Sequence, residues 1–339
     1  MRNNITIKGD ELKPFVHGVL SAYTAGSGTL RMGRFTEKQL AVYKEDSALM
    51  GREFYSRATA TSGISLEMIT DSSFIGLQYN WYPATGHDFF SADIYLDGCL
   101  AAHRYSENRA HHIISADLPE GTHNVQIFLP WNVETELISL VLSEGSGCRP
   151  MEKKKRILAF GDSITQGYIG KHPSLSYMNI TAREFDAEIL NQAVGGYWFR
   201  DRVLDPALAS WKPDLITVAY GTNDFTFQEE FEGYAAGAEN YIKKLTEIFP
   251  DTKILGIMPI KRFDSPFFDR MRIRNYTVEE AHNSIRKAYA EYGNVTVLED
   301  TFYPASEDFY APDQLHPNDA GFLCYGKAVV DAIRKKRLL

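Results

Sequence analysis

Ser163, Asp313 and His316 are the residues in this sequence whose types and spacing could carry out acyl transfer. A serine hydroxyl becomes a nucleophile when a neutral imidazole within hydrogen-bond reach takes its proton, and a carboxylate can orient that imidazole. His316 is the candidate base, and Asp313, three residues earlier, is the candidate orienting acid. The pattern therefore predicts hydrolysis or transfer of an acyl group through a covalent serine ester.

The same chemistry needs hydrogen-bond donors for the negative charge that develops on the carbonyl oxygen. We expect three of them: the backbone N–H of Ser163, the backbone N–H of Gly196 and the side-chain amide of Asn223. Gly196 suits this role because a residue without Cβ lets its N–H approach the substrate closely.

These residues lie in four polar segments, and each segment follows a predicted strand or precedes the last predicted helix. The segments are Gly161-Asp-Ser-Ile-Thr-Gln-Gly167, Asn191-Gln-Ala-Val-Gly-Gly196, Gly221-Thr-Asn-Asp224 and Asp313-Gln-Leu-His-Pro317. The predicted strands are Arg156–Phe160, Ala187–Leu190, Leu215–Tyr220, Lys253–Met258 and Val295–Leu298, and the predicted helices are Ser176–Phe185, Tyr234–Phe249, Val278–Tyr292 and Ala320–Lys336. This alternation predicts a three-layer α/β/α domain with a five-stranded parallel sheet, which would bring the segments together at one edge.

The first 150 residues differ from the rest because short runs with strand-like alternation follow one another without a convincing helical period. Such runs are Ile64–Thr70, Phe74–Tyr79, Ala92–Leu96, Asn124–Leu129 and Glu134–Leu142. Asp97-Gly98 and Glu120-Gly121 predict hairpin turns. We therefore predict an all-β sandwich or jelly roll over residues 1–150 and the α/β domain over residues 151–339.

In this order, the four segments resemble the four sequence blocks of the SGNH (GDSL-type) hydrolase family, over about residues 156–336. Gly161-Asp-Ser163 matches the first block, Gly196 the second, Gly221-Thr-Asn-Asp224 the third and Asp313-Gln-Leu-His316 the last. The resemblance implies Ser163 as nucleophile, His316 as base and Asp313 as orienting acid, with Ser163, Gly196 and Asn223 as oxyanion donors. Gly195 is the alternative glycine, but Gly196 has the spacing from Asn191 that this block usually shows.

Some of these residues also allow other interpretations. Ser163 could cap the helix that follows it, since serine is a preferred N-cap residue. An α/β-hydrolase would need a Gly-x-Ser-x-Gly elbow, and the sequence contains none. Aromatic rings crowd the predicted reactive edge, and Tyr197, Trp198 and Phe225 are candidates for binding substrate, although packing beneath loops is the alternative.

Composition excludes several classes of function. The chain has 339 residues and a formal net charge of −8, so it lacks the basic surface that nucleic-acid binding needs. The longest apolar runs are far shorter than the roughly 18 residues of a membrane span, and the chain opens without a signal-peptide pattern, so a cytoplasmic location is expected. Three separated cysteines and the absence of a His-Glu-x-x-His motif predict no disulfide framework, metal or cofactor.

A β-sandwich before an SGNH domain resembles some carbohydrate esterases, which implies that the substrate is a small-molecule or oligosaccharide ester. We therefore expect O-deacetylation of a carbohydrate through an acyl-enzyme intermediate. The alternatives are a lysophospholipase or thioesterase that acts on longer acyl chains and, in a different class, a glycan-binding protein with an inert hydrolase fold. Association into a homo-oligomer is compatible with the sequence.

Overall fold

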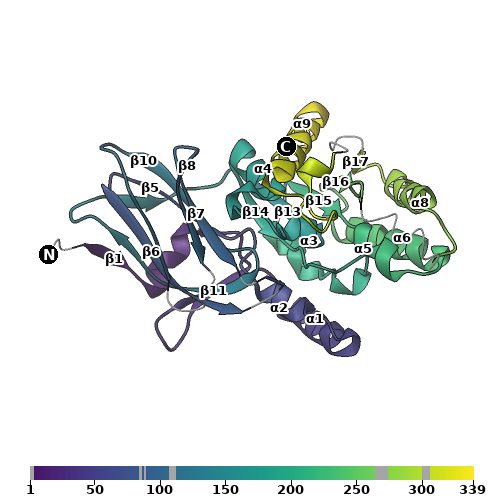
Figure 1. Ribbon diagram of the computed structural model, residues 1–339, viewed down its shortest axis with the longest axis horizontal. Coiled ribbons are helices and arrows are strands. Elements are labelled where there is room, and N and C mark those ends of the chain that lie inside the picture. Colours follow the sequence, from purple (N-terminus) through teal and green to yellow (C-terminus); the bar gives the residue numbers. More distant parts are fainter. Residues whose placement is uncertain (1–3, 84–85, 88, 107–111, 264–273, 300–305) are drawn as a thin grey trace.

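The computed structural model contains two antiparallel sheets in the first part of the chain and one parallel sheet in the rest (Figure 1). It describes residues 4–339 apart from 84–85, 88, 107–111, 264–273 and 300–305. The last strand of the antiparallel sheets ends at Pro150, and the first strand of the parallel sheet begins at Lys155. The predicted division of the chain into residues 1–150 and 151–339 lies at this crossover and stays a prediction about folding units.

The parallel sheet confirms the predicted five strands. Its spatial order is β14 (Ala187–Asn191), β13 (Lys155–Gly161), β15 (Leu215–Ala219), β16 (Lys253–Ile257) and β17 (Val295–Leu298), with all neighbouring pairs parallel. The chain starts in the middle of the sheet at β13, adds β14 on one side and then returns to add β15 on the other. This reversal between β13 and β15 is the type of position at which open α/β sheets bind their ligands.

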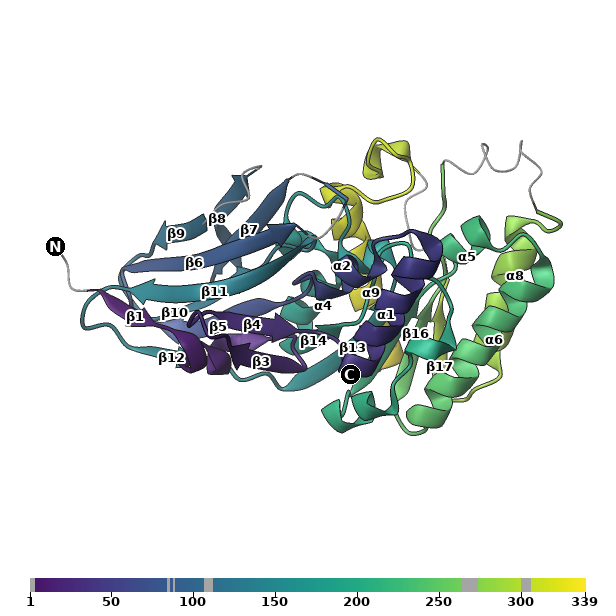
Figure 2. The ribbon, with the colours of Figure 1, turned by 90° about the horizontal axis from the view of Figure 1, so that it is seen from below.

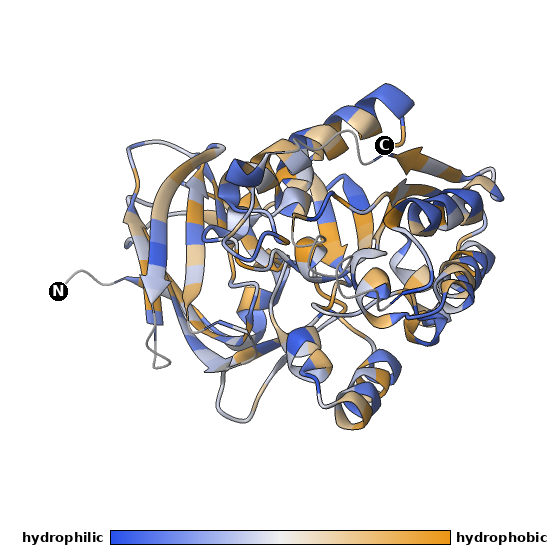
Figure 3. Ribbon diagram, turned by 45° about the vertical axis from the view of Figure 1, so that its right-hand side comes forward, coloured by the Kyte–Doolittle hydropathy of each residue, from blue (hydrophilic) through white to orange (hydrophobic). Residues whose placement is uncertain are grey.

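Helices cover both faces of the parallel sheet because successive side chains of a strand point to opposite faces. Leu158 and Phe160 of β13 belong to the core beneath α6 (Phe231–Ile248) and α8 (Val278–Ala290), whereas Ile157 and Ala159 pack beneath α4 (Tyr177–Phe185) and α9 (Asp319–Lys336). Figure 3 shows the resulting pattern, in which mostly hydrophobic strands lie between helices with hydrophilic outer faces. The three-layer α/β/α prediction is confirmed.

The antiparallel strands form a sandwich. One sheet has the order β3 (Ser21–Thr24), β4 (Leu30–Gly33), β11 (Val133–Leu142), β6 (Phe74–Pro83) and β9 (His112–Asp117), with β1 (Ile5–Ile7) on β11. The other has the order β12 (Cys148–Pro150), β5 (Ser65–Thr70), β10 (His123–Phe128), β7 (Phe90–Leu96) and β8 (Cys99–Ser106), with β2 (Val16–His17) on β5. Buried residues from both sheets share one apolar core, so the predicted β-rich N-terminal domain is confirmed.

Of the two predicted hairpin turns, one forms. Asp97 and Gly98 join β7 to β8 with positive φ at both residues, as a tight two-residue hairpin requires. Glu120 and Gly121 instead join β9 to β10, which lie in different sheets. The second hairpin prediction is wrong because a glycine turn signal marks a change of chain direction but does not specify which strands pair.

The expectation of no helix in the first 150 residues is also wrong. Helix α1 (Glu37–Met50) and helix α2 (Phe54–Thr59) follow the short strand β4. They lie beside the parallel sheet in Figure 2, and four apolar residues of this segment, Phe35, Tyr43, Phe54 and Ala58, join the core beneath α6 and α8. The N-terminal part of the chain therefore supplies part of the packing of the α/β domain.

Two further segments are helical only briefly. Helix α3 (Ser163–Gln166) follows β13, and helix α5 (Thr222–Phe227) follows β15. Both begin directly after a strand at the edge where the polar segments were expected. No helix in the described part of the chain combines the length and the apolar character that crossing a bilayer requires.

Candidate active site

The structure brings Ser163, His316 and Asp313 into one hydrogen-bonded line. Ser163 Oγ lies 2.7 Å from His316 Nε2, and His316 Nδ1 lies 2.6 Å from Asp313 Oδ2. Ser163 and His316 each expose less than a tenth of their surface, whereas the Asp313 side chain is 37% exposed. This is the arrangement in which an imidazole can take the serine proton while a carboxylate holds its other nitrogen.

The loop between η6 (Glu307–Phe309) and α9 holds the histidine and the aspartate in this relation. Ala311 N donates to His316 O at 2.8 Å, and Gln314 N donates to Ala311 O at 2.9 Å, which folds the loop back on itself. Gln314 adopts a left-handed φ of 56° at the tip. Two side chains only three residues apart can therefore face each other without a helical turn.

Asp313 is held in its ionised form. Burial raises its pKa, but the hydrogen bond and charge of His316, together with backbone N–H groups of His316 and Leu315, outweigh this and lower the pKa to about 2. Asp313 Oδ1 accepts these backbone bonds at 3.0 Å from His316 N and 3.1 Å from Leu315 N. The carboxylate oxygen that faces the imidazole is thus fixed in both charge and direction.

Ser163 lies at the first residue of α3, but it does not cap that helix. The cap is Asp162, whose Oδ1 accepts a hydrogen bond from Ile164 N at 3.0 Å. The alternative interpretation of Ser163 as an N-cap residue is therefore wrong, and its hydroxyl is directed to His316 instead. Gly167, in a left-handed conformation, ends the helix after a single turn.

Of the two glycines after β14, Gly196 has the uncommitted N–H group. Gly195 N donates to Gln166 Oε1 at 2.7 Å, whereas Gly196 N makes no hydrogen bond within the described residues. Gly196 has a φ of 77°, a conformation that favours glycine. This geometry supports Gly196 rather than Gly195 as an oxyanion donor.

Asn223 lies at the start of α5, close to the serine loop, but its amide is engaged. Its Nδ2 donates to Tyr197 O at 3.0 Å and to Asp162 Oδ2 at 3.3 Å. An oxyanion beside Ser163 would have to replace the longer of these two bonds, the one to Asp162. The predicted donor is therefore held next to the site by groups that also compete for its hydrogens.

The carboxyl groups of Asp162 and Asp224 are buried at this edge. Burial raises the pKa of Asp162 to about 6 and that of Asp224 to about 7, although backbone N–H groups lower both. Asp224 accepts bonds from Phe199 N and Gly221 N, each at 3.0 Å, and so ties the third polar segment to the second. These contacts give both residues a positioning role around Asn223.

An arginine that the sequence analysis did not single out lies beside the glycines. Arg57 of α2 donates from Nη1 to Gly195 O at 2.8 Å, and a Cβ added to Gly196 would stand 2.9 Å from the same atom. Its side chain is 19% exposed. The helical segment between β4 and β5 thus reaches the active site, and no local motif around Arg57 indicates this.

Tyr168 borders the site on the side of the base. Its ring centroid lies 4.5 Å from that of His316, and the ring of Trp131, from the N-terminal domain, lies 5.1 Å from Tyr168. Tyr168 is partly exposed, so one part of its ring is open to a bound molecule. The two domains together therefore form the aromatic wall beside His316.

The structure does not support the three aromatic residues predicted to bind substrate. Tyr197 has no exposed surface, Trp198 is 6% exposed and Phe225 is 5% exposed, and all three belong to the core beneath α6 and α8. Tyr197 donates its hydroxyl hydrogen to Asp46 of α1 at 2.6 Å. Trp198 lines a cavity of about 500 Å³ beneath α1, and Phe225 lines one of about 350 Å³ beside Arg262; neither includes Ser163 or His316.

Residues 159–322, which contain every residue of this hydrogen-bonded line, match the model of the GDSL-like Lipase/Acylhydrolase family. This part of the chain is a GDSL-like lipase/acylhydrolase domain. The resemblance that its four polar segments predicted is confirmed. The chain is also similar to the human protein named isoamyl acetate-hydrolyzing esterase 1 homolog (Homo sapiens). The two are 25% identical over 210 residues, and the match covers 54% of this chain and 82% of the relative.

Solved structures resemble the chain over nearly its full length, the N-terminal domain included. The salicylyl-acyltransferase SsfX3 from a tetracycline biosynthetic pathway has a TM-score of 0.80 at 20% identity and covers 100% of this chain and 99% of its own. A putative GDSL-like lipase from Bacteroides ovatus has a TM-score of 0.77 at 19% identity, covering 98% of each chain. A family two carbohydrate esterase from Cellvibrio japonicus has a TM-score of 0.64 at 16% identity, covering 99% and 98%. At these identities the likeness concerns the fold, a GDSL domain preceded by a β-rich domain.

Proposed function

We propose that this GDSL hydrolase is a serine esterase that removes small acyl groups, acetyl first among them, from a hydroxyl of a carbohydrate. The observation that carries the esterase part is the line from Ser163 Oγ through His316 to Asp313, with bonds of 2.7 and 2.6 Å. A hydroxyl, an imidazole and an ionised carboxylate so aligned are the arrangement by which a serine carries out acyl transfer.

In the first half of the reaction, Ser163 Oγ attacks the ester carbonyl while its proton passes to His316 Nε2. The carbonyl oxygen becomes negative and accepts hydrogen bonds from the N–H groups of Ser163 and Gly196 and from Asn223 Nδ2. Asp313 stabilises the imidazolium that forms. The tetrahedral intermediate then expels the sugar alkoxide, which leaves with the proton from His316, and the acyl group remains on Ser163.

In the second half, a water molecule takes the place of the sugar hydroxyl. His316 removes its proton as the oxygen attacks the acyl-serine, and the proton returns to Ser163 Oγ when the carboxylic acid leaves. The same acyl-enzyme would pass its acyl group to a second alcohol if one were bound there in preference to water. Which molecule accepts the acyl group, water or an alcohol, therefore depends on what binds beside Tyr168 and Arg57 and not on the triad.

The carbohydrate part of the proposal is supported by the surroundings of the triad. A partly exposed tyrosine beside the base offers an aromatic face that the buried ring of Trp131 backs, and Arg57 places a guanidinium beside Gly195. Polar groups with one aromatic face suit a sugar better than a long acyl chain, which needs an extended apolar surface. The family two carbohydrate esterase from Cellvibrio japonicus combines a similar fold with activity on carbohydrates, as its name states.

The test is an ester panel measured with the full chain. Acetate release is followed from acetylated mono- and oligosaccharides, and nitrophenyl esters of increasing chain length are hydrolysed in parallel. We expect acetylated sugars to exceed all nitrophenyl esters in kcat/KM, and Ser163→Ala to abolish both activities. Ser210→Ala, which changes an exposed serine on η4 (Pro206–Trp211), serves as the matched control and should leave them unchanged.

Two results would change the proposal. A preference for acyl chains of eight or more carbons would favour the lysophospholipase or thioesterase alternative. Ester hydrolysis that persists in Ser163→Ala, together with binding of sugars, would favour a glycan-binding protein with an inert hydrolase fold. The ester panel gives the first result, and the second also needs a measurement of sugar binding by the unaltered chain and by Ser163→Ala.

A further inference from the structure

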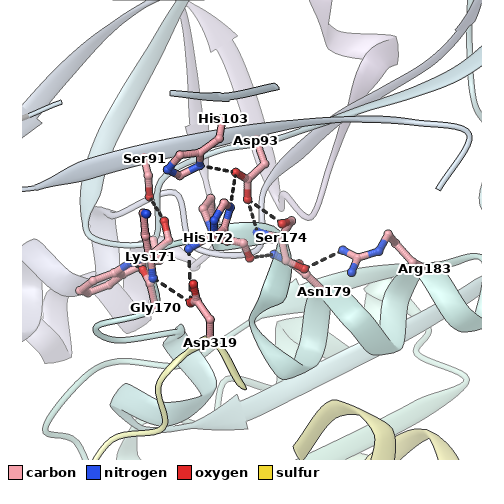
Figure 4. A network of polar contacts seen from close by, with 12 residues as sticks. Ser91, Asp93, His103, Gly170, Lys171, His172, Ser174, Asn179, Arg183 and Asp319 are labelled. Atoms are coloured by element: carbon pink, nitrogen blue, oxygen red, sulfur yellow. Dashed lines mark hydrogen bonds and ion pairs between the residues drawn. The ribbon is translucent and has the colours of Figure 1, made fainter. Parts of the chain in front are cut away.

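Outside the catalytic line, two imidazoles share one carboxylate oxygen at the junction of the two domains (Figure 4). Asp93 lies on β7, His103 lies opposite it in the register of the neighbouring strand β8, and His172 lies in the loop before η2 (Pro173–Leu175). His103 Nδ1 is 2.6 Å and His172 Nδ1 is 3.1 Å from Asp93 Oδ1. The ligand-type atoms of the three residues all lie within 4.8 Å of one another.

The carboxylate of this cluster is held in one orientation. Asp93 has no exposed surface, and its second oxygen, Oδ2, accepts hydrogen bonds from Ser174 N at 3.0 Å and Ser174 Oγ at 2.6 Å. These bonds fix the plane of the carboxyl group so that Oδ1 faces the two imidazoles. Hydrogen bonds to the non-ligating oxygen of a carboxylate are the outer partners that metal sites use to orient their ligands.

The imidazoles are not fully satisfied by hydrogen bonds alone. His316 in the active site uses both ring nitrogens, whereas His103 uses Nδ1 only, and its Nε2 is buried without a partner in the described part of the chain. The two rings also lie close together, with centroids 4.1 Å apart. The Nδ1 atoms of both rings are directed at the same buried carboxylate oxygen, an arrangement that a cation bound among the three atoms would explain.

We propose that Asp93, His103 and His172 form a binding site for a divalent transition metal ion, with Zn²⁺ as the preferred ion. Two imidazole nitrogens and one carboxylate oxygen are a donor set that suits zinc and its neighbours and not Mg²⁺ or Ca²⁺, which prefer oxygen ligands. The side chains of His103 and His172 are 19% and 20% exposed, so a water molecule can complete a tetrahedral shell from the solvent side. Small movements of the rings away from Oδ1 open the space for the ion, since ligand atoms around zinc stand about 2 Å from the metal.

Such an ion would join the two domains next to the catalytic base. Asp93 and His103 belong to the sandwich, and His172 belongs to the loop that follows the serine segment. Asp319 Oδ1 accepts hydrogen bonds from Lys171 N at 2.9 Å and His172 N at 3.4 Å, and Asp319 begins α9 three residues after His316. The metal would therefore stabilise the docking of the N-terminal domain on the loop that contacts the start of α9.

The test uses the full chain after treatment with a chelator and removal of that chelator. Binding of Co²⁺ is followed by its visible absorption, which is intense for tetrahedral coordination, and binding of Zn²⁺ is followed by calorimetry and by the shift in Tm. We expect one equivalent of either ion to bind and Zn²⁺ to raise Tm. His103→Ala and His172→Ala should each weaken binding by more than about 100-fold, and Ser174→Ala should weaken it by about tenfold.

Two controls locate the site. His123 forms a hydrogen bond of 2.7 Å with Asp97 on the same sheet but has no second imidazole there, so His123→Ala should bind the metal as the unaltered chain does. His316→Ala should also retain binding, because the proposed site is separate from the triad. Failure of the unaltered chain to bind either ion, equal binding by His103→Ala, or loss of binding only in His316→Ala would overturn the proposal. If His172→Ala does not fold, the comparison of His103→Ala with His123→Ala decides the question alone.

Discussion

Two carboxyl groups near Ser163 lie in surroundings that give them opposite ionisation. Asp313 is partly exposed and receives three hydrogen bonds, which lower its pKa to about 2 despite some burial. Asp162 is fully buried, and this burial raises its pKa to about 6. Asp313 therefore carries a permanent negative charge for His316, whereas Asp162 can lose and gain a proton near neutral pH and serves to position the serine loop and Asn223.

The role of Asp313 predicts the effect of Asp313→Asn. The asparagine oxygen can still accept the backbone bonds of residues 315 and 316, but its amide group would face His316 Nδ1 with a donor and favour the wrong tautomer. We expect kcat to fall by about 10³–10⁴-fold with little change in KM, as for comparable substitutions in serine hydrolases. Steady-state kinetics on an acetyl ester measures both constants. Asp308→Asn, at an exposed residue of η6 just before this loop, is the control. A fall of less than tenfold in Asp313→Asn would show that the carboxylate does not orient the base.

The raised pKa of Asp162 predicts a change in stability with pH. Folding raises the pKa of Asp162 from 3.8 to about 6, so the folded chain binds a proton at this residue more tightly than the unfolded chain does. The protonated carboxyl therefore adds to the free energy of unfolding in full below about pH 4, and this stabilisation is lost as the pH rises through 6. An asparagine in its place, as in Asp162→Asn, would stay neutral at every pH. This variant should therefore gain unfolding free energy relative to the unaltered chain between pH 4 and pH 7, by up to about 3 kcal/mol.

Urea unfolding at several pH values across this range measures that difference. The comparison removes the contribution of Asp313, which both chains share. Asp224 responds to the substitution, because the charge of Asp162 raises its pKa, and its change is part of the measured difference. A difference between variant and unaltered chain that stays constant from pH 4 to pH 7, or that declines, would mean that Asp162 does not titrate in this range in the folded state.

At the scale of elements, the sequence predicts correctly those helices and strands whose apolar residues are the ones that become buried. The strands of the parallel sheet and the helices α4, α6, α8 and α9 lie close to their predicted residues, because each has a clear apolar run or face. Ser163, His316 and Asp313 come together as predicted, since loops after parallel strands meet at one edge. Tyr197, Trp198 and Phe225, predicted to bind substrate, are buried in the core, a place for which an aromatic residue near a reactive loop is equally suited.

Helix α1 could not be recognised from an apolar stripe. Its three buried residues are Gln39, Tyr43 and Asp46, so two of its three inward positions are polar. Gln39 bonds to Gln192, and Asp46 receives the hydroxyl of Tyr197, contacts that exist only after the domains meet. One local signal was present: Thr36 and Gln39 form a capping box, the Thr-x-x-Gln pattern that marks a helix start.

The contribution of α2 to the active site also depends on tertiary structure, since Arg57 and Gly195 are 138 residues apart. Arg57 holds the carbonyl of Gly195 while Gln166 holds its N–H, and together they orient the peptide that presents Gly196 N–H. Arg57→Met keeps the length of the side chain but removes this hydrogen bond. We expect kcat to fall by at least about tenfold, up to the 10²–10³-fold typical for a lost oxyanion donor, with a smaller change in KM.

Kinetics on the acetyl ester separates this positioning role from a role in substrate binding. Arg57→Lys should recover part of kcat, because an ammonium group can reach the same carbonyl. A rise in KM with kcat unchanged in Arg57→Met would instead show that the guanidinium contacts the substrate and that the Gly195 peptide keeps its orientation without it.

At the scale of the whole molecule, the two domains are separate in sheet topology but continuous in packing. The core beneath α6 and α8 includes Phe35, Tyr43, Phe54 and Ala58 from the N-terminal part of the chain. Arg34 lies at the centre of this contact. It is buried, and its guanidinium donates to the carbonyls of Ala60, Arg57 and Ala58 on one side and of Asn191 and Ala193 on the other.

Arg34→Met therefore tests whether the domains stabilise each other. Burial lowers the pKa of Arg34 to about 9, so the group is still charged at pH 7, and its removal leaves five carbonyl contacts unmade, four of them buried. We expect the unfolding free energy to fall by about 3–5 kcal/mol, the range for breaking a buried charged network. Arg149→Met, at an exposed arginine of β12, should change it by less than about 1 kcal/mol.

The shape of the unfolding curve carries the second half of this prediction. Because the domains share a core, the unaltered chain should lose its sandwich and its parallel sheet in one transition, seen alike by tryptophan fluorescence and circular dichroism. In Arg34→Met we expect the two signals to separate, and acetyl ester hydrolysis to be lost with the first of them, since Asn191 and Ala193 lead directly to the oxyanion glycine Gly196. Coincident transitions in both chains with equal midpoints would mean that apolar packing alone couples the domains and that the arginine is dispensable to it.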